Sequence, residues 1–118
     1  PYVSAGVNVV CAATDEAADE LFARTEIERL RGFLSRGREV PLTTEQAEQM
    51  VDTPAGYEIR SMLRFTAVGG PQSVREQLAG FQELANADEL VTVHPSPSRA
   101  EQLESLRLAA PAYTASGE

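Results

Sequence analysis

Apolar residues along this chain fall either in short continuous runs or at helical spacing. The run Val7–Ala13, VNVVCAA, is apolar except at Asn8. Such a run is typical of a strand that is covered on both faces in a parallel sheet. We expect this strand to follow an irregular lead-in over residues 1–6. Asn8 needs a hydrogen-bond partner if it is buried.

The stretch 66–95, TAVGGPQSVREQLAGFQELANADELVTVHP, predicts strand, tight turn, amphipathic helix and strand. The strands are expected at Thr66–Val68 and Leu90–Val93, and Gly69, Gly70 and Pro71 turn the chain between the first strand and the helix. The helix, from Gln72 to about Asn86, is expected to bury Val74, Leu78, Phe81 and Ala85. A strand–helix–strand unit of this kind implies parallel strands and a right-handed crossover.

Capping residues divide the rest of the chain into helices. Thr14 is a good N-cap for a helix that we expect to end near Arg36, with Gly37 as a left-handed cap. Residues 38–64 predict a helical insertion: a short helix with a Thr43–Gln46 capping box, then a second helical piece over 55–64.

A closing helix is expected after the last strand. Ser98 and Glu101 make a second capping box, and the helix should run to about Ala110, with Leu103, Leu106 and Ala110 on one side. Pro111 is expected to stop it and to leave a flexible tail over 111–118.

The predicted order is strand, helix, helical insertion, strand, helix, strand, helix, which is α/β with one domain over residues 1–110. Three parallel strands make a poor domain because their outer strands expose apolar edges. This favours more strands in a longer chain, or a partner molecule. The opening at Pro1, which leads straight into a strand, is also typical of the middle of a protein, a processed terminus or a trimmed chain.

The composition argues against some classes of binding partner. The net charge of -8 argues against a nucleic-acid backbone and an anionic membrane surface, both of which need clustered basic residues. The single cysteine, Cys11, excludes an internal disulfide and is expected to be a small buried hydrophobe. The sequence has no transmembrane-length apolar run and no signal peptide, so we expect a cytoplasmic protein.

No catalytic or metal-binding set is predicted from the residues themselves. The acidic positions Asp15, Glu16, Asp19 and Glu20 are expected to form a solvated helix face, since they lack the loop of a calcium site. The single histidine, His94, and the single cysteine lie in unrelated segments, which gives no nucleophile–base pair.

Two segments resemble luciferase-like flavin-dependent monooxygenases. PYVSAGVNVVCAATDEAADELF, residues 1–22, resembles a late strand and helix of that family of oxidoreductases. Residues 53–93 resemble its closing portion, where the strand–turn–helix Val68–Val74 is followed by the last strand, at Asn86–Val91. The resemblance spans Pro1 to about Ala110. It departs at Gly70, where the family usually carries the Ser or Thr that caps the helix.

The resemblance implies a partial (β/α)8 TIM barrel, in which this chain supplies the last three parallel strands, six to eight, with the insertion at 38–64. It implies FMN or a deazaflavin as cofactor of the full-length enzyme, with oxygen and an organic substrate. The residues that hold the flavin and do catalysis lie mostly on earlier strands in the family. We therefore expect this chain alone to be inactive, with no catalytic residue and no tightly bound flavin.

Four residues are candidates for the barrel mouth. His94 directly follows the last strand and lies near flavin or substrate, or is an exposed loop histidine. Gly69 and Gly70 cradle an anion at a helix N-terminus, or form a plain turn. Arg64, like Arg60, belongs to the insertion and meets a phosphate or carboxylate, or is solvated.

A second hypothesis comes from a different class. The chain is then a stand-alone α/β interaction module that dimerises through its open sheet edges. Self-association through exposed strand edges is expected in both cases, because a piece of a barrel also has to cover its edges.

Overall fold

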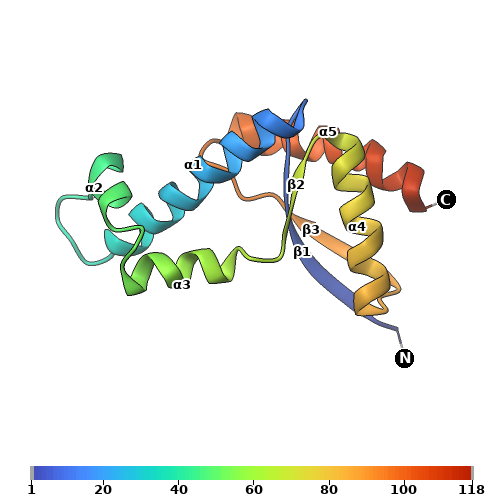
Figure 1. Ribbon diagram of the computed structural model, residues 1–118, viewed down its shortest axis with the longest axis horizontal. Coiled ribbons are helices and arrows are strands. Elements are labelled where there is room, and N and C mark those ends of the chain that lie inside the picture. Colours follow the sequence, from blue (N-terminus) through green and yellow to red (C-terminus); the bar gives the residue numbers. More distant parts are fainter. Residues whose placement is uncertain (1, 118) are drawn as a thin grey trace.

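The computed structural model describes the backbone of residues 2–117 and the side chains of residues 2–110 (Figure 1). Strands alternate with helices over this range, so the predicted α/β class is confirmed. The elements are β1 (Ser4–Cys11), α1 (Asp15–Leu34), α2 (Thr44–Gln49), α3 (Pro54–Met62), β2 (Thr66–Gly69), α4 (Pro71–Ala85), β3 (Glu89–Val93) and α5 (Arg99–Gly117).

The three strands are parallel, as predicted, but β1 lies in the middle of the sheet. Asn8–Cys11 pairs with β2 and Ser4–Asn8 pairs with β3. The predicted irregular lead-in is therefore wrong from Ser4 onward, because pairing with Glu89 and its neighbours draws these residues into the strand. The order β2-β1-β3 also differs from consecutive barrel strands, whose middle member is the second.

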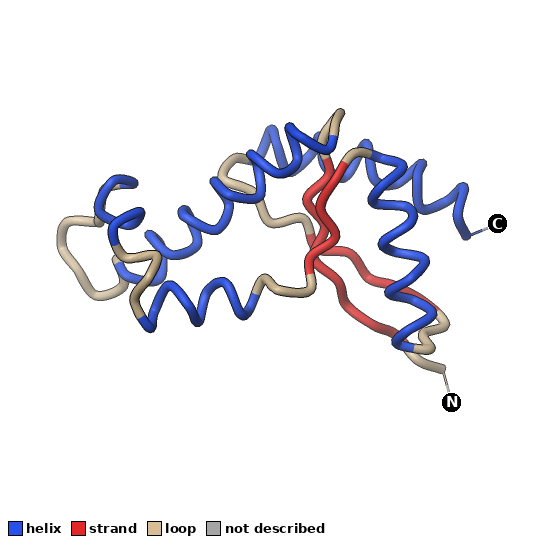
Figure 2. The backbone as a smooth tube through the Cα atoms, in the orientation of Figure 1, coloured by secondary structure: helices blue, strands red, loops and turns tan. Residues whose placement is uncertain are grey.

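Helices α4 and α5 lie on one side of the strands, and α1, α2 and α3 extend on the other (Figures 1 and 2). The main core lies under α4 and α5 and contains Val7, Val9, Cys11, Ala67, Val74, Leu78 and Ala109. The predicted inner face of α4 is confirmed at Val74 and Leu78, and Phe81 packs on the edge of the cluster. Ala85, the last residue of the helix, is exposed instead.

The other face of β3 is open. Val91 and Val93 point away from the main core and are 52% and 51% exposed. Parallel sheets are usually covered on both faces. An apolar surface of this kind therefore remains available next to the sheet.

The second half of α1 packs with α2 and α3 to form an arm that projects from the sheet (Figure 2). Its small core consists of Leu30, Ile59 and Leu63. The predicted caps are confirmed at Thr14, which accepts the Ala17 N–H at 3.1 Å. The Thr43–Gln46 capping box is also present, with both of its hydrogen bonds.

Two helix ends differ from expectation. Helix α1 ends at Leu34, earlier than predicted, although Gly37 does adopt the left-handed conformation with φ 77°. Helix α5 continues through Pro111 to Gly117, since a proline removes one hydrogen bond without obliging a helix to end. The predicted tail at 111–118 is thus helical as far as Gly117, and Glu118 lies outside the described residues.

The buried side of α5 is not the side that was predicted from its apolar residues. Leu103, Leu106 and Ala110 do share a side, but that side faces solvent. Ser105 and Ala109 are buried against the sheet instead. The Ser98 hydroxyl accepts the Glu101 N–H at 3.2 Å, which is one half of the predicted capping box. The Glu101 carboxylate accepts the Ser98 hydroxyl at 2.9 Å and not its backbone N–H. Among the described residues, no helix is both long enough and apolar enough to cross a bilayer.

Candidate functional site

The carboxyl edge of the sheet is the place where this topology favours a site. Strands β2 and β3 lie on opposite sides of β1. The connection after β1 therefore leads to one side of it, and the connection after β2 leads to the other side. In open α/β sheets, ligands bind in the crevice at such a switch point, outside the carboxyl ends of the strands. Ala12–Thr14 and Gly69–Pro71 meet here, and the Ala12 N–H donates to the Gly69 carbonyl at 3.2 Å. Strand β3 ends opposite Asn8, so His94–Pro97 leaves the sheet before the carboxyl end of β1.

Two side chains are buried beside β1, past the end of its pairing with β3. His94 is 4% exposed and Ser105 is 1% exposed. The His94 Nδ1 lies 2.7 Å from the Ser105 hydroxyl, and its Nε2 lies 3.1 Å from the Thr92 hydroxyl. The sequence alternatives placed His94 at a flavin-facing mouth or in an exposed loop, and the structure buries it instead.

Ser105 makes hydrogen bonds to the part of β1 that has no pairing with β3, where a neighbouring strand would otherwise make them. Its hydroxyl oxygen accepts the Cys11 N–H at 2.9 Å and lies 3.5 Å from the Val9 carbonyl. The two backbone groups belong to the edge of β1 beyond Asn8, where the pairing with β3 ends. A buried N–H without a partner is costly, so this serine completes the edge.

The hydrogen-bond distances favour one tautomer of His94. The Ser105 oxygen accepts the Cys11 N–H, and its proton can go to the Val9 carbonyl at 3.5 Å or to the His94 Nδ1 at 2.7 Å. We assign the proton to the shorter contact, which makes the His94 Nδ1 an acceptor. The Nε2–H then donates to Thr92. Burial lowers the pKa of His94, which favours this neutral form. The imidazole ties β3, α5 and β1 together and has no free nitrogen with which to act on a ligand.

The Gly69–Gly70 turn holds an anion, but the anion is the chain's own. The Gly70 N–H donates to the Asp15 Oδ1 at 2.7 Å. This backbone hydrogen bond, and a second one from the Ser73 side chain, lower the pKa of Asp15. The Asp15 carboxylate thus lies at the start of α4, where the helix dipole favours a negative charge, and an external phosphate would meet an occupied position.

Backbone geometry explains the first glycine of the turn. Gly69 has φ 156°, and a Cβ there would lie 2.6 Å from the Ser73 Cβ. A side chain at this position would therefore clash with the first turn of α4.

The arginine candidates lie elsewhere. Arg64 precedes β2, at the amino edge of the sheet, and its guanidinium lies 4.7 Å from the centre of the Phe65 ring. The five steps along the chain from Arg64 to Gly69 span roughly 16 Å at the rise of an extended strand. Arg60, in α3, donates to the Val51 carbonyl at 3.1 Å. The four mouth candidates therefore do not converge on one ligand.

The remaining reactive groups are also inert. Burial, reinforced by the charge of Glu104, raises the pKa of the Cys11 thiol to about 11, so it stays protonated near neutral pH. This confirms the prediction of a buried, hydrophobe-like cysteine. Over the described residues, no three His, Cys, Asp or Glu side chains gather to hold a metal ion.

Gln77 and Ser105, which the sequence did not indicate as important, make hydrogen bonds to the edges of strands. Gln77 binds the outer edge of β2: its oxygen accepts the Val68 N–H at 3.1 Å and its nitrogen donates to the Val68 carbonyl at 2.7 Å. An amide placed in this way copies a neighbouring strand and blocks pairing at that position. Ser105 does the same for β1. Neither residue stands out from the pattern of apolar and polar positions in the sequence.

A flavin does not fit the groups that this chain presents. At the Gly69–Gly70 turn, its phosphate would meet the Asp15 carboxylate, which already accepts the Gly70 N–H at 2.7 Å. The hollow of about 370 Å³ beside the end of β1 is lined by Glu20, Glu101 and Glu104, with Arg24 already paired with Glu101, so it is unsuited to an anionic cofactor.

Comparisons with known proteins match the chain to parts of longer proteins. No family model matches the chain. Over 114 residues the chain is 30% identical to the uncharacterized protein YvbT of Bacillus subtilis (strain 168), a match that covers 93% of this chain and 33% of YvbT. It is also similar to the crystal structure of apo-MsnO8, with a TM-score of 0.68 and 28% identity over 97% of this chain and 35% of MsnO8. The chain spans about a third of the length of both proteins.

Proposed function

We propose that this chain corresponds to the C-terminal part of a luciferase-like flavin-dependent monooxygenase and is inactive by itself. The match of nearly the whole chain to about a third of two longer proteins supports one half of the proposal, that the chain corresponds to part of a longer protein. The family and the C-terminal position rest on the motifs at Val68–Val74 and Asn86–Val91, which occur in the order and spacing of the closing part of that family.

The strand order fits this proposal only if β3 moves when further strands are present. In a barrel, strands that follow one another in sequence are neighbours, so β3 would pair with β2. Here β3 pairs with the first half of β1, at Ser4–Asn8. With β1 as strand six, this is the edge that strand five would take. We propose that β3 occupies the vacant edge in this chain and gives it up in the complete barrel.

In the complete enzyme the flavin supplies the oxygen chemistry, and this chain contributes barrel wall. The open face of β3, with Val91 and Val93, then faces the interior of the barrel. The buried His94–Ser105 pair holds the wall together from the helix side. No step of the reaction is assigned to residues of this chain.

The proposal is tested by adding FMN and reduced FMN to the chain alone, and to the chain mixed with MsnO8 that lacks its matched third. Flavin fluorescence and calorimetry report binding. We expect no binding by the chain alone and recovery of binding in the mixture. Tight stoichiometric binding by the chain alone would overturn the proposal.

The second candidate is a stand-alone module that dimerises through a strand edge. One observation favours it: β3 leaves an outer edge next to the exposed Val91 and Val93, whereas Gln77 blocks β2. Light scattering at rising concentration tests this candidate. Val91→Glu should weaken a dimer of this kind, while a chain that stays monomeric at high concentration sinks it.

A further inference from the structure

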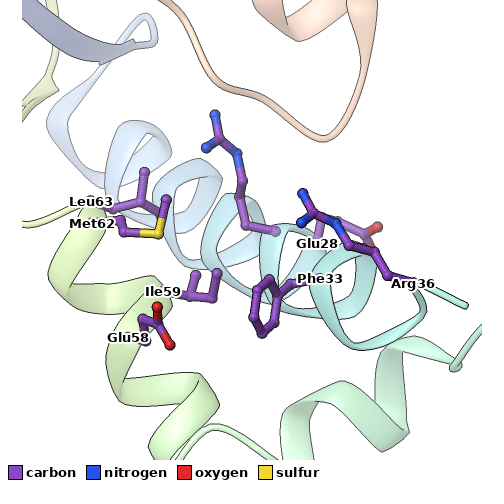
Figure 3. Close-up of a pocket in the computed structure, with 9 residues that line it drawn as sticks. Glu28, Phe33, Arg36, Glu58, Ile59, Met62 and Leu63 are labelled. Carbon is purple, nitrogen blue, oxygen red and sulfur yellow. The ribbon is translucent and has the colours of Figure 1, made fainter.

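A groove in the arm carries chemistry that the carboxyl edge of the sheet lacks. It has a volume of about 590 Å³ and lies between the second half of α1 and the last turns of α3. Figure 3 shows Phe33 on α1 facing Ile59 on α3 across it, with Met62 and Leu63 along the same side. Its volume falls in the range of small-molecule sites.

The floor of the groove is apolar and accessible. Phe33 is 38% exposed and Met62 is 62% exposed, whereas Ile59 and Leu63 beneath them are buried in the arm core. Exposed aromatic and thioether groups over a packed base offer a surface on which a flat apolar body can lie.

The rim carries two arginines whose charge is not neutralised. Arg29 and Arg36 both line the groove, seven residues apart on α1, and among the described residues no carboxylate lies within ion-pair distance of either one. The Arg36 guanidinium lies over the Phe33 ring, 5.6 Å from its centre, so this charge is held at the edge of the apolar floor.

The carboxylates nearby do not cancel this charge. Glu28 is held by Arg31 at 2.9 Å and accepts the Thr44 hydroxyl at 3.2 Å. Glu58 lies on the α3 side of the groove (Figure 3). In a chain of net charge -8, a groove with two unpaired arginines and one unpaired carboxylate is a local exception.

We propose that the groove binds a small organic anion, namely a flat apolar body that carries one carboxylate. The body lies on Phe33 and Met62, and the carboxylate pairs with the Arg36 guanidinium, whose planar fork suits a carboxylate. A neutral analogue keeps the first contact and loses the second. This inference does not rest on the flavin proposal, because the arm residues belong to the chain as it stands.

The test is a titration of the ¹⁵N-labelled chain with 2-naphthoate, followed by amide chemical shifts. A ligand of about 13 non-hydrogen atoms should bind with a Kd on the order of 1 mM. The Gly32 amide, in the groove, should shift in a saturable way. The Gly80 amide, on α4, should not move.

Variants separate an anion site from a merely apolar patch. Arg36→Gln should raise the Kd at least about threefold, as expected for the loss of an exposed charge pair, and Met62→Glu should abolish binding. Arg75→Gln, on α4 outside the groove, is the control and should change nothing. Circular dichroism confirms that each variant is folded.

Three results would overturn the proposal. The Gly32 amide fails to shift, 2-naphthalenemethanol binds as tightly as 2-naphthoate, or Arg36→Gln leaves the affinity unchanged. A second copy of the chain that covers the groove would give the first of these results.

Discussion

Removing the Ser105 hydroxyl should destabilise the chain far more than an ordinary helix serine does. In Ser105→Ala, the Cys11 N–H loses its acceptor and the His94 Nδ1 loses its donor. Both groups are buried, and each unsatisfied buried group costs about 1–3 kcal/mol. Alanine returns about 0.5 kcal/mol through its better helix propensity. The net loss should be about 2 kcal/mol or more.

The assay is urea unfolding at pH 7.5, followed by circular dichroism. The matched control is Ser61→Ala, which removes an exposed serine from α3. Its stability should rise by a few tenths of a kcal/mol, because alanine is the better helix former. Nitrogen chemical shifts of the imidazole provide a second readout and should show the Nε2–H tautomer of His94 in the parent chain.

A loss below about 0.5 kcal/mol in Ser105→Ala would refute the reasoning, since it would mean that water replaces the hydroxyl at no cost. An Nδ1–H tautomer in the parent would also refute it, because His94 would then donate to Ser105 and not accept from it.

Further predictions concern the core, a glycine contact and pH. Leu78→Ala should cost about 2–5 kcal/mol in urea unfolding because the side chain is fully buried, whereas Leu84→Ala on the same helix, 85% exposed, should cost almost nothing. Gly56→Ala should lower the melting temperature, since a Cβ there would lie 2.1 Å from the Val51 carbonyl oxygen, while Gly80→Ala, with open space around it, should raise stability by about 0.5–1 kcal/mol. Burial lowers the pKa of His94 in the folded chain, so the unfolded chain takes up the proton at a higher pH. The free energy of unfolding should therefore fall as the pH drops below about 6.5 and be retained above it. In His94→Gln, a free energy of unfolding that stays constant from pH 7.5 to 5.5 would support this assignment, and the same dependence on pH as in the parent would contradict it.

The sequence predicts the elements of this fold well because they rest on local signals. The apolar run at Val7–Cys11, the cap at Thr14 and the capping box at Thr43 act within a few residues of themselves. Element existence and type follow from such signals, and ends follow less well. Ser4 shows why: it joins β1 only through its pairing with Glu89, far along the chain.

The site could not be predicted in the same way, because its contacts join distant segments. Asp15 meets Gly70 across 55 residues, and Ser105 meets Cys11 across 94. Nothing local marks either of them, since Asp15 resembles any acidic residue in a first helical turn. His94 carries the expected residue type at the expected strand end, and only the packing of α5 decides that it is buried.

The central claim, that this chain is the closing part of a flavin enzyme, is tested most directly by a chimera. The matched third of MsnO8 is replaced by residues 1–118 of this chain, and binding of FMN and of a deazaflavin is measured by fluorescence beside intact MsnO8. We predict that intact MsnO8 and the chimera bind the same flavin, with affinities within about tenfold of each other. A folded chimera that binds neither flavin, or an intact MsnO8 that binds neither, would contradict the account.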